Sequence, residues 1–244
     1  MVLTAKRAGA FPATLIFYIL FLIQLTNLNL FNIIVLKKGA VPLPKIVDHD
    51  KRKQLIADAM IRAINQVGLE KITVRKIAEE AGLSMGSVQY YFPAQHDLYI
   101  YAMELIAQRI KKRILSIARD DMPVEKKVIA IMKQLISSES ADQKVEGEVW
   151  LSFSMMALRD AQLEALSHEL FRTTRELLRK LLATLRDRQY LGAALDIELE
   201  AVNLHAFIDG ITLQTIVYLK VFDETKIDEL LMNYLHNLKR RSET

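Results

Sequence analysis

The sequence predicts an all-α protein of about nine helices, and three observations lead to this fold class. Glycine and proline are scarce, at 8 and 5 of 244 residues, which disfavours turn-rich sheet folds. After residue 44, apolar residues recur with helical spacing in one segment after another. No stretch there alternates apolar and polar residues for long enough to predict a strand.

The first four predicted helices are short segments with clear boundary signals. They cover residues 51–67, 74–81, 85–92 and 95–118. Asp48 or Asp50 offers a cap for the first helix, and Thr73 and Ser84 offer caps for the next two. Gly68 and Gly82 are suited to helix ends, and Pro93 ends the third helix.

Longer helices are predicted for the rest of the chain. Pro123 is placed at a first helical position, and the apolar stripe Val128, Ile131, Met132 and Leu135 follows it. A helix around 149–157 carries Val149, Trp150, Phe153 and Ala157, and leucines recur on one face of 162–188. Gly192 marks the exit from that helix, and 196–220 and 225–239 close the chain.

The composition excludes several classes of chemistry. Cysteine is absent, which removes disulfides, thiolate metal sites and a cysteine nucleophile. The five histidines have no metal-ligand spacing, and the sequence has no zinc-protease, serine-hydrolase or phosphate-loop motif. His205 and Asp209 lie one helical turn apart, and we interpret them as a satisfied pair rather than a base with its orienting carboxylate. We expect no catalytic residues, no metal and no cofactor.

Charge is distributed unevenly along the chain. Residues 45–117 carry twelve basic and eight acidic residues, whereas residues 118–244 carry seventeen basic and twenty-one acidic ones. A basic segment beside an acidic one suggests that only the first part meets a polyanion, and uneven scatter of surface charge is the alternative.

The first 44 residues do not match the rest. From Ala8 to Leu36 there is no charged residue, which is long enough for a membrane span, although Asn27, Asn29 and Asn32 are costly in hydrocarbon. Three interpretations compete: a membrane anchor, a signal peptide, or a segment upstream of the true translation start. We favour the third, and expect truncation to residue 41 or later to leave fold and activity unchanged.

Residues 73–92 form a recognisable two-helix unit. Counting from Val74, the fifth residue is Ala78, where two crossing helices need a small side chain, and the ninth is Gly82, where a turn needs positive φ. The positions expected to point inward are Ile77, Ala81, Leu83, Val88 and Tyr91, which leaves Ser84, Met85, Ser87, Gln89 and Tyr90 mostly outward. This pattern predicts a helix-turn-helix whose second helix enters the major groove of DNA. An ordinary helical hairpin in a core is the alternative.

The same residues resemble the DNA-binding domain of the TetR family of transcriptional repressors. The resemblance is carried above all by Thr73–Val88, followed by Tyr90, Tyr91 and Phe92, with Gln54–Gly68 similar to the first helix of that domain. Val149–Phe153 and Ile208–Gln214 resemble the ligand-binding half of the BetI-like subgroup. The resemblance implies a DNA-binding domain over residues 45–110 and a ligand-binding and dimerisation domain over 119–241.

Roles for individual residues follow from this resemblance and from helix geometry. Thr73 and the free N–H groups of its helix are expected to bind a backbone phosphate. Gln89 is our candidate base reader, since glutamine matches the adenine edge, with a phosphate contact as the alternative. Tyr91 contacts phosphate in the family, and a purely structural ring is the alternative. Gln95 stands where many members have lysine, which predicts a shallower salt dependence.

The second half is expected to dimerise and to bind a small-molecule effector. Ile227, Leu231, Tyr234 and Leu238 repeat with coiled-coil-like spacing, and Leu213, Ile216 and Val217 could form a matching face; packing within one chain is the alternative. We expect the effector contacts to come from seven residues with suitable side chains: Trp150, Phe153, Met156, Arg159, His205, Phe207 and Tyr218. Trp150 makes a choline-type ligand conceivable, although one tryptophan is not an aromatic cage.

Together these features predict a ligand-responsive repressor in the cytoplasm that binds a palindromic operator as a homodimer. The alternative from another class is a membrane-anchored helical sensor or interaction protein that uses residues 11–36. The operator, the effector and the direction of the response are beyond what the sequence specifies.

Overall fold

The computed structural model describes residues 48–67, 71–136, 140–218 and 221–243, and within these ranges the chain forms nine helices and no strand. The all-α prediction is therefore confirmed for the described residues. The helices are α2 (His49–Val67), α3 (Val74–Ala81), α4 (Met85–Tyr91), α5 (Gln95–Arg119), α6 (Val124–Lys133), α7 (Ala141–Ala157), α8 (Ala161–Asp187), α9 (Ile197–Val217) and α10 (Glu224–Ser242).

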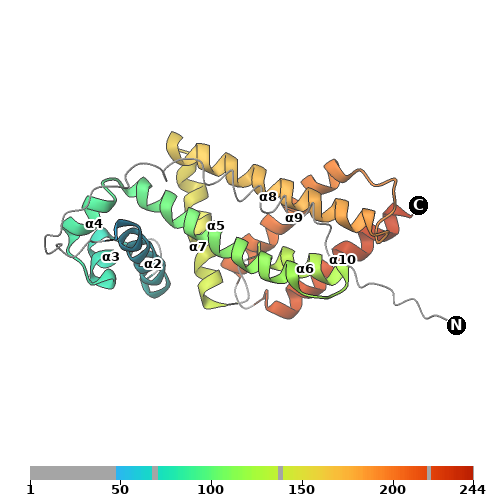
Figure 1. Ribbon diagram of the computed structural model, residues 1–244, viewed down its shortest axis with the longest axis horizontal. Coiled ribbons are helices and arrows are strands. Elements are labelled where there is room, and N and C mark those ends of the chain that lie inside the picture. Colours follow the sequence, from blue (N-terminus) through green and yellow to red (C-terminus); the bar gives the residue numbers. More distant parts are fainter. Residues whose placement is uncertain (1–47, 68–70, 137–139, 219–220, 244) are drawn as a thin grey trace, which may run out of the picture.

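The molecule is elongated, with the three short N-terminal helices at one end (Figure 1). Helices α2, α3 and α4 form this end, which we call the head. Helix α5 leaves the head and runs into the remainder of the molecule, where α8, α9 and α10 pack, and α7 crosses α5 near its middle (Figure 1). We call the part formed by α6, α9, α10 and the second half of α8 the body.

Side-chain caps fix where most helices begin. Asp48, rather than Asp50, caps α2, since its Oδ1 accepts a hydrogen bond from the N–H of Lys51 at 3.1 Å. Asp160, Asp196 and Asp223 cap α8, α9 and α10 in the same way. Pro123 precedes α6 as its N-cap residue and is not its first helical residue. Gly68 lies outside the described residues.

Gly192 has a different role from the one its position suggested. The left-handed residue that follows α8 is Gln189, at φ 60°. Gly192 instead donates its N–H to Ser242 Oγ at 2.8 Å, and a Cβ at position 192 would lie 1.8 Å from the Ser242 carbonyl oxygen. The glycine is therefore required by close contact with the end of α10 and not by a turn.

The buried apolar residues form two clusters. One joins the head to the first half of α5, to α7 and to the start of α8, through side chains such as Ile64, Val88, Met103, Val149 and Phe153. The other joins the end of α5 to the body. Most members of both clusters are no more than 5% exposed. Helix α7 therefore packs with the head, although it lies beyond the predicted boundary of the DNA-binding domain at residue 110, which stays a prediction.

The apolar seam predicted on α10 packs inside the chain. Ile227, Leu231 and Leu238 are fully buried in the body cluster, and Tyr234 packs against it, so this seam is not an intermolecular surface. The 4-3-4 spacing identified an apolar face correctly but contained no information on which surface covers it. By contrast, Leu213 and Val217 on α9 are 44% and 54% exposed.

None of the helices in the described ranges is long and apolar enough to cross a membrane. The apolar stretch at 11–36 lies outside those ranges, so the three interpretations of the first 44 residues stay predictions.

Candidate nucleic-acid interface

The turn between α3 and α4 has the conformation that the helix-turn-helix pattern requires. Gly82 lies at φ 64° and ψ 36°, and its N–H donates to the Glu79 carbonyl while the N–H of Leu83 donates to Ala78. These two bonds satisfy the last carbonyls of α3 and end the helix. Ser84, two residues after the glycine, then caps α4 by accepting from the Ser87 N–H at 3.1 Å, so the second helix starts at Met85.

The two helices cross over small and apolar side chains. Ala78 is 2% exposed, and Ile77 and Val88 are 3% and 1% exposed, so the fifth position does carry a small residue in a tight contact. Ala81, Leu83 and Tyr91 are partly buried, which agrees with the inward side predicted for them. Burial of the inward-facing side chains therefore holds the two helices together, and the opposite face of α4 is exposed to solvent.

A polar clamp ties α3 to α2. Glu80 accepts hydrogen bonds from Arg62 Nε at 2.9 Å and from Gln66 Nε2 at 3.0 Å. The hydrogen bond from Arg62 lowers the pKa of the Glu80 carboxyl below its ordinary value. The clamp supplements the apolar packing of α3 against α2, which sets the direction in which α4 projects.

Helix α4 presents most of the predicted contact residues to solvent. Met85 and Tyr90 are 47% and 70% exposed, Ser84 and Gln89 are also exposed, and Ser87 is half-buried. Tyr90 and Met85 therefore add an aromatic ring and an apolar side chain to the solvent-exposed face of α4. The N-terminal residues of the helix and Gln89 therefore form one solvent-facing surface.

The residues that flank α4 extend this surface. Thr73 Oγ1 accepts from the N–H of Lys76 at 3.1 Å, so its own hydroxyl proton remains available to donate to a phosphate oxygen. Tyr91 is half-buried and packs edge-on against Tyr90, with ring centroids 5.2 Å apart. Gln95 is the first residue of α5, and its side chain lies outside what the structure describes.

Two further residues on this side were not singled out from the sequence. Lys71 is exposed two residues before Thr73, where a charge can reach phosphate. Gly86 is exposed in the first turn of α4, and a Cβ there would meet nothing within 4 Å. A residue without a side chain at this point lets a nucleic-acid backbone approach the helix closely. The sequence signal that identifies Gly86 is a glycine in the first turn of the helix predicted to enter the major groove.

The seven predicted effector residues do not gather at one place. Trp150, Phe153 and Met156 belong to or pack against the cluster shared with the head, and Phe153 is a 1%-exposed core residue. Phe207 packs on the other cluster and stacks on Tyr234, with centroids 4.7 Å apart. Arg159 and Tyr218 are exposed. The effector site stays a prediction.

His205 and Asp209 lie close together without forming a short hydrogen bond. His205 Nε2 is 3.8 Å from Asp209 Oδ1, and the imidazole packs at a tilt against the Phe171 ring, with centroids 4.8 Å apart. Burial lowers the pKa of His205 and raises that of Asp209, and both shifts favour the neutral forms. Among the described residues, no group of three or more His, Asp or Glu side chains is placed to hold a metal ion.

A capped two-helix unit with a left-handed glycine turn and an exposed second helix defines a helix-turn-helix DNA-binding regulator. The chain belongs to the TetR family. The model of "bacterial regulatory proteins, tetR family" matches residues 56–102, and that of the "BetI-type transcriptional repressor, C-terminal" matches residues 125–240.

Relatives and solved structures agree with this assignment. The HTH-type transcriptional regulator PksA of Bacillus subtilis is 31% identical over 196 residues, which cover 80% of this chain and 94% of PksA. BetI of Escherichia coli K12 is 25% identical over 195 residues, covering 79% of this chain and 96% of BetI. These relatives are regulators and not enzymes.

Two crystal structures show the same fold. A transcriptional regulator from Rhodococcus has a TM-score of 0.67 at 22% identity, covering 79% of this chain and 98% of its own. A regulator from Saccharomonospora viridis, solved in complex with choline, has a TM-score of 0.68 at 16% identity, covering 77% and 96%.

Replacing Gly82 tests the turn. Gly82→Val places a β-branched residue at φ 64°, which costs about 1–2 kcal/mol of head stability, although the space around it is open. Gly82→Asn is the control, since asparagine tolerates this region. Thermal unfolding of the two variants should separate them; equal melting temperatures for the valine, asparagine and parent proteins would contradict the turn's importance.

Replacing Gln89 tests base reading. Gln89→Ala should cost about 1–3 kcal/mol of binding at one base position and relax specificity there, because the bidentate match to one base edge is lost. Binding is measured against a set of single-base operator variants. An equal loss for every sequence would make Gln89 a phosphate contact instead.

Proposed function

We propose that the protein is a ligand-responsive transcriptional repressor that binds a palindromic operator as a homodimer. The observation that carries the proposal is the exposed surface of α4, with Met85, Gln89 and Tyr90 facing solvent on a helix anchored from behind by Val88. A helix presented in this way fits the major groove, and two copies fit two half-sites about one helical turn apart. The repressor role follows the description of the C-terminal family model.

A face of α9 fits the second subunit. Leu199, Val202, Leu213 and Val217 are 55%, 40%, 44% and 54% exposed. Their spacing of 3, 11 and 4 residues places them in one stripe along the helix. Gly210 lies on the same stripe and a Cβ there would meet nothing within 4 Å, so a second helix can approach closely. An exposed apolar stripe along most of one helix favours a symmetric interface in which each subunit covers the stripe of the other.

The effector is expected to bind within the C-terminal half. The choline complex of the Saccharomonospora regulator makes a quaternary ammonium the first class to try. Trp150 is half-buried on α7 and supplies an aromatic face of the kind that such cations contact. Binding in that half must then change the spacing or orientation of the two heads to change DNA affinity.

Binding to the DNA upstream of the protein's own gene tests the proposal. The purified protein should bind one palindromic segment there at nanomolar concentrations, in the range of specific regulators, and choline or related cations should change that affinity. The matched control is the same DNA with one half-site scrambled, which should lose most of the affinity. Equal affinity for the palindromic and scrambled DNA would overturn the proposal.

Replacing Leu213 tests the dimer face. Leu213→Asp should weaken self-association by about 100-fold or more, because each fully buried leucine contributes about 1.5–3 kcal/mol and a symmetric interface loses two. Leu158→Asp is the matched control, since Leu158 is 75% exposed on a different surface. Analytical ultracentrifugation measures both. A variant at 213 that associates as tightly as the control would place the interface elsewhere.

A further inference from the structure

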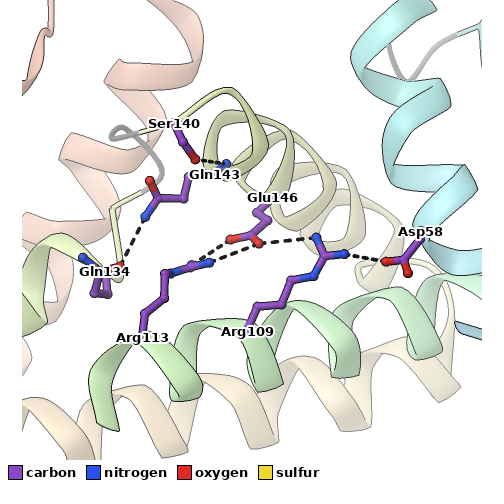
Figure 2. Close-up of polar contacts among 7 residues, drawn as sticks. All are labelled: Asp58, Arg109, Arg113, Gln134, Ser140, Gln143 and Glu146. Atoms are coloured by element: carbon purple, nitrogen blue, oxygen red, sulfur yellow. Dashed lines mark hydrogen bonds and ion pairs between the residues drawn. The ribbon is translucent and has the colours of Figure 1, made fainter. Parts of the chain in front are cut away.

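A chain of charged side chains links the head to α7. Arg109 on α5 donates from Nη2 to Asp58 Oδ1 on α2, and its Nη1 lies 3.7 Å from Glu146 Oε1 on α7. Arg113, one turn further along α5, donates to both oxygens of the same Glu146, at 3.3 Å and 2.8 Å. Figure 2 shows Glu146 pointing between the two guanidinium groups, with Arg109 reaching past it to Asp58.

Glu146 is the constrained member of this chain. Its side chain is 4% exposed, whereas those of Asp58, Arg109 and Arg113 are 27–32% exposed. A buried carboxylate is tolerated only when it is paired and hydrogen-bonded, so α7 and α5 are held at the separation that lets both guanidinium groups reach it. Arg109 divides its planar fork between this carboxylate and the head, a geometry that lysine does not reproduce.

The chain lies where the two apolar clusters meet. Ile110, between the two arginines on α5, packs against both clusters. Separately from this chain of charges, Gln143, one turn before Glu146 on α7, donates to Gln134 at the end of α6 at 3.3 Å, which connects α7 to the body. The border is polar, with an open depression of about 330 Å³ lined by Arg109, Arg113 and residues at the start of α7. Ion pairs of this kind can exchange partners, whereas interlocked apolar side chains resist sliding.

We infer that Arg109 is a positioning residue for DNA binding, which holds the head in register with α7 by pairing with Asp58 and Glu146 at once. A shift of α7 against α5 withdraws Glu146 from Arg109 and leaves Arg109 paired with Asp58 alone, so that only the apolar cluster still joins α7 to the head. The inference rests on the proposed function, because it concerns how the head is presented to DNA. Its tests are chosen so that one of them needs no DNA.

The first test asks whether removal of the Glu146 charge strengthens or weakens DNA binding. Glu146→Gln removes an acidic group, and electrostatics alone predicts tighter binding to DNA because repulsion of phosphate falls. Loss of the positioning pair predicts the opposite, a weakening of about tenfold, within the range typical of coupling between distant sites. Glu176→Gln is the matched control: Glu176 on α8 also binds an arginine and a lysine, Arg179 at 2.7 Å and Lys180 at 3.2 Å. The control should bind DNA as tightly as the parent or more tightly.

Non-additivity gives a second readout on the same assay. Asp58 and Glu146 each pair with Arg109, so Asp58→Asn and Glu146→Gln should each weaken binding, and the double variant should be little worse than either one. Unchanged or tighter binding by Glu146→Gln, or fully additive losses in the double variant, would overturn the inference.

A distance measurement tests the inference without DNA. The chain has no native cysteine, so Glu79→Cys on α3 and Asp187→Cys at the end of α8 introduce one pair of spin labels at exposed sites. Labelled chains are mixed with excess unlabelled chains so that the distance is measured within one subunit. We expect Glu146→Gln to shift or broaden the distance distribution, and Glu176→Gln to leave it unchanged.

Arg109→Lys keeps the inference testable where Glu146→Gln does not fold, because it retains the charge and removes only the two-sided fork. It should broaden the same distribution. A lowered melting temperature with an unchanged distribution in the folded variants would mean that the network only stabilises the protein, and would overturn the inference. If the parent protein binds no operator, the proposed function fails, and the distance measurement still decides on Arg109.

Discussion

The candidate DNA-binding surface on α4 depends on the burial of one face of a helix that is too short to be stable alone. Helix α4 has seven residues, fewer than an isolated helix needs to be stable in water. It exists because Val88 and Phe92 are buried in the cluster formed with α2, α3 and α5, and because Ser84 supplies its cap. The exposed polar and aromatic side chains on the opposite face add nothing to this packing, so they are free to serve recognition.

Local chemistry made this part of the protein predictable. Thr73, Gly82 and Ser84 act on backbone atoms two to four residues away, so their roles as cap, turn and cap are encoded within one short segment. The small side chain at Ala78 is likewise explained by the crossing of α3 and α4, two helices that follow each other directly in the sequence. The head was therefore predicted from the sequence to within a few residues at each boundary, and the family resemblance pointed to the same segment.

Long-range packing was not predictable in the same way. The stripe on α10 was recognised as apolar, but the same spacing serves an intermolecular seam and an internal core, and only the three-dimensional structure shows that Ile227 and Leu231 face their own chain. Glu146 gave no signal because its two arginine partners lie 33 and 37 residues earlier in the sequence. Gly192 was recognised as a special position, but its cause, contact with Ser242, lies fifty residues away.

The sharing of one apolar cluster between the head and α7 has a consequence for chimeric regulators. A DNA-reading module transplanted at the sequence boundary near residue 110 would leave behind the side chains of Val145, Val149 and Phe153, and expose the surface they cover. The unit that can be exchanged is therefore discontinuous in sequence and includes α7.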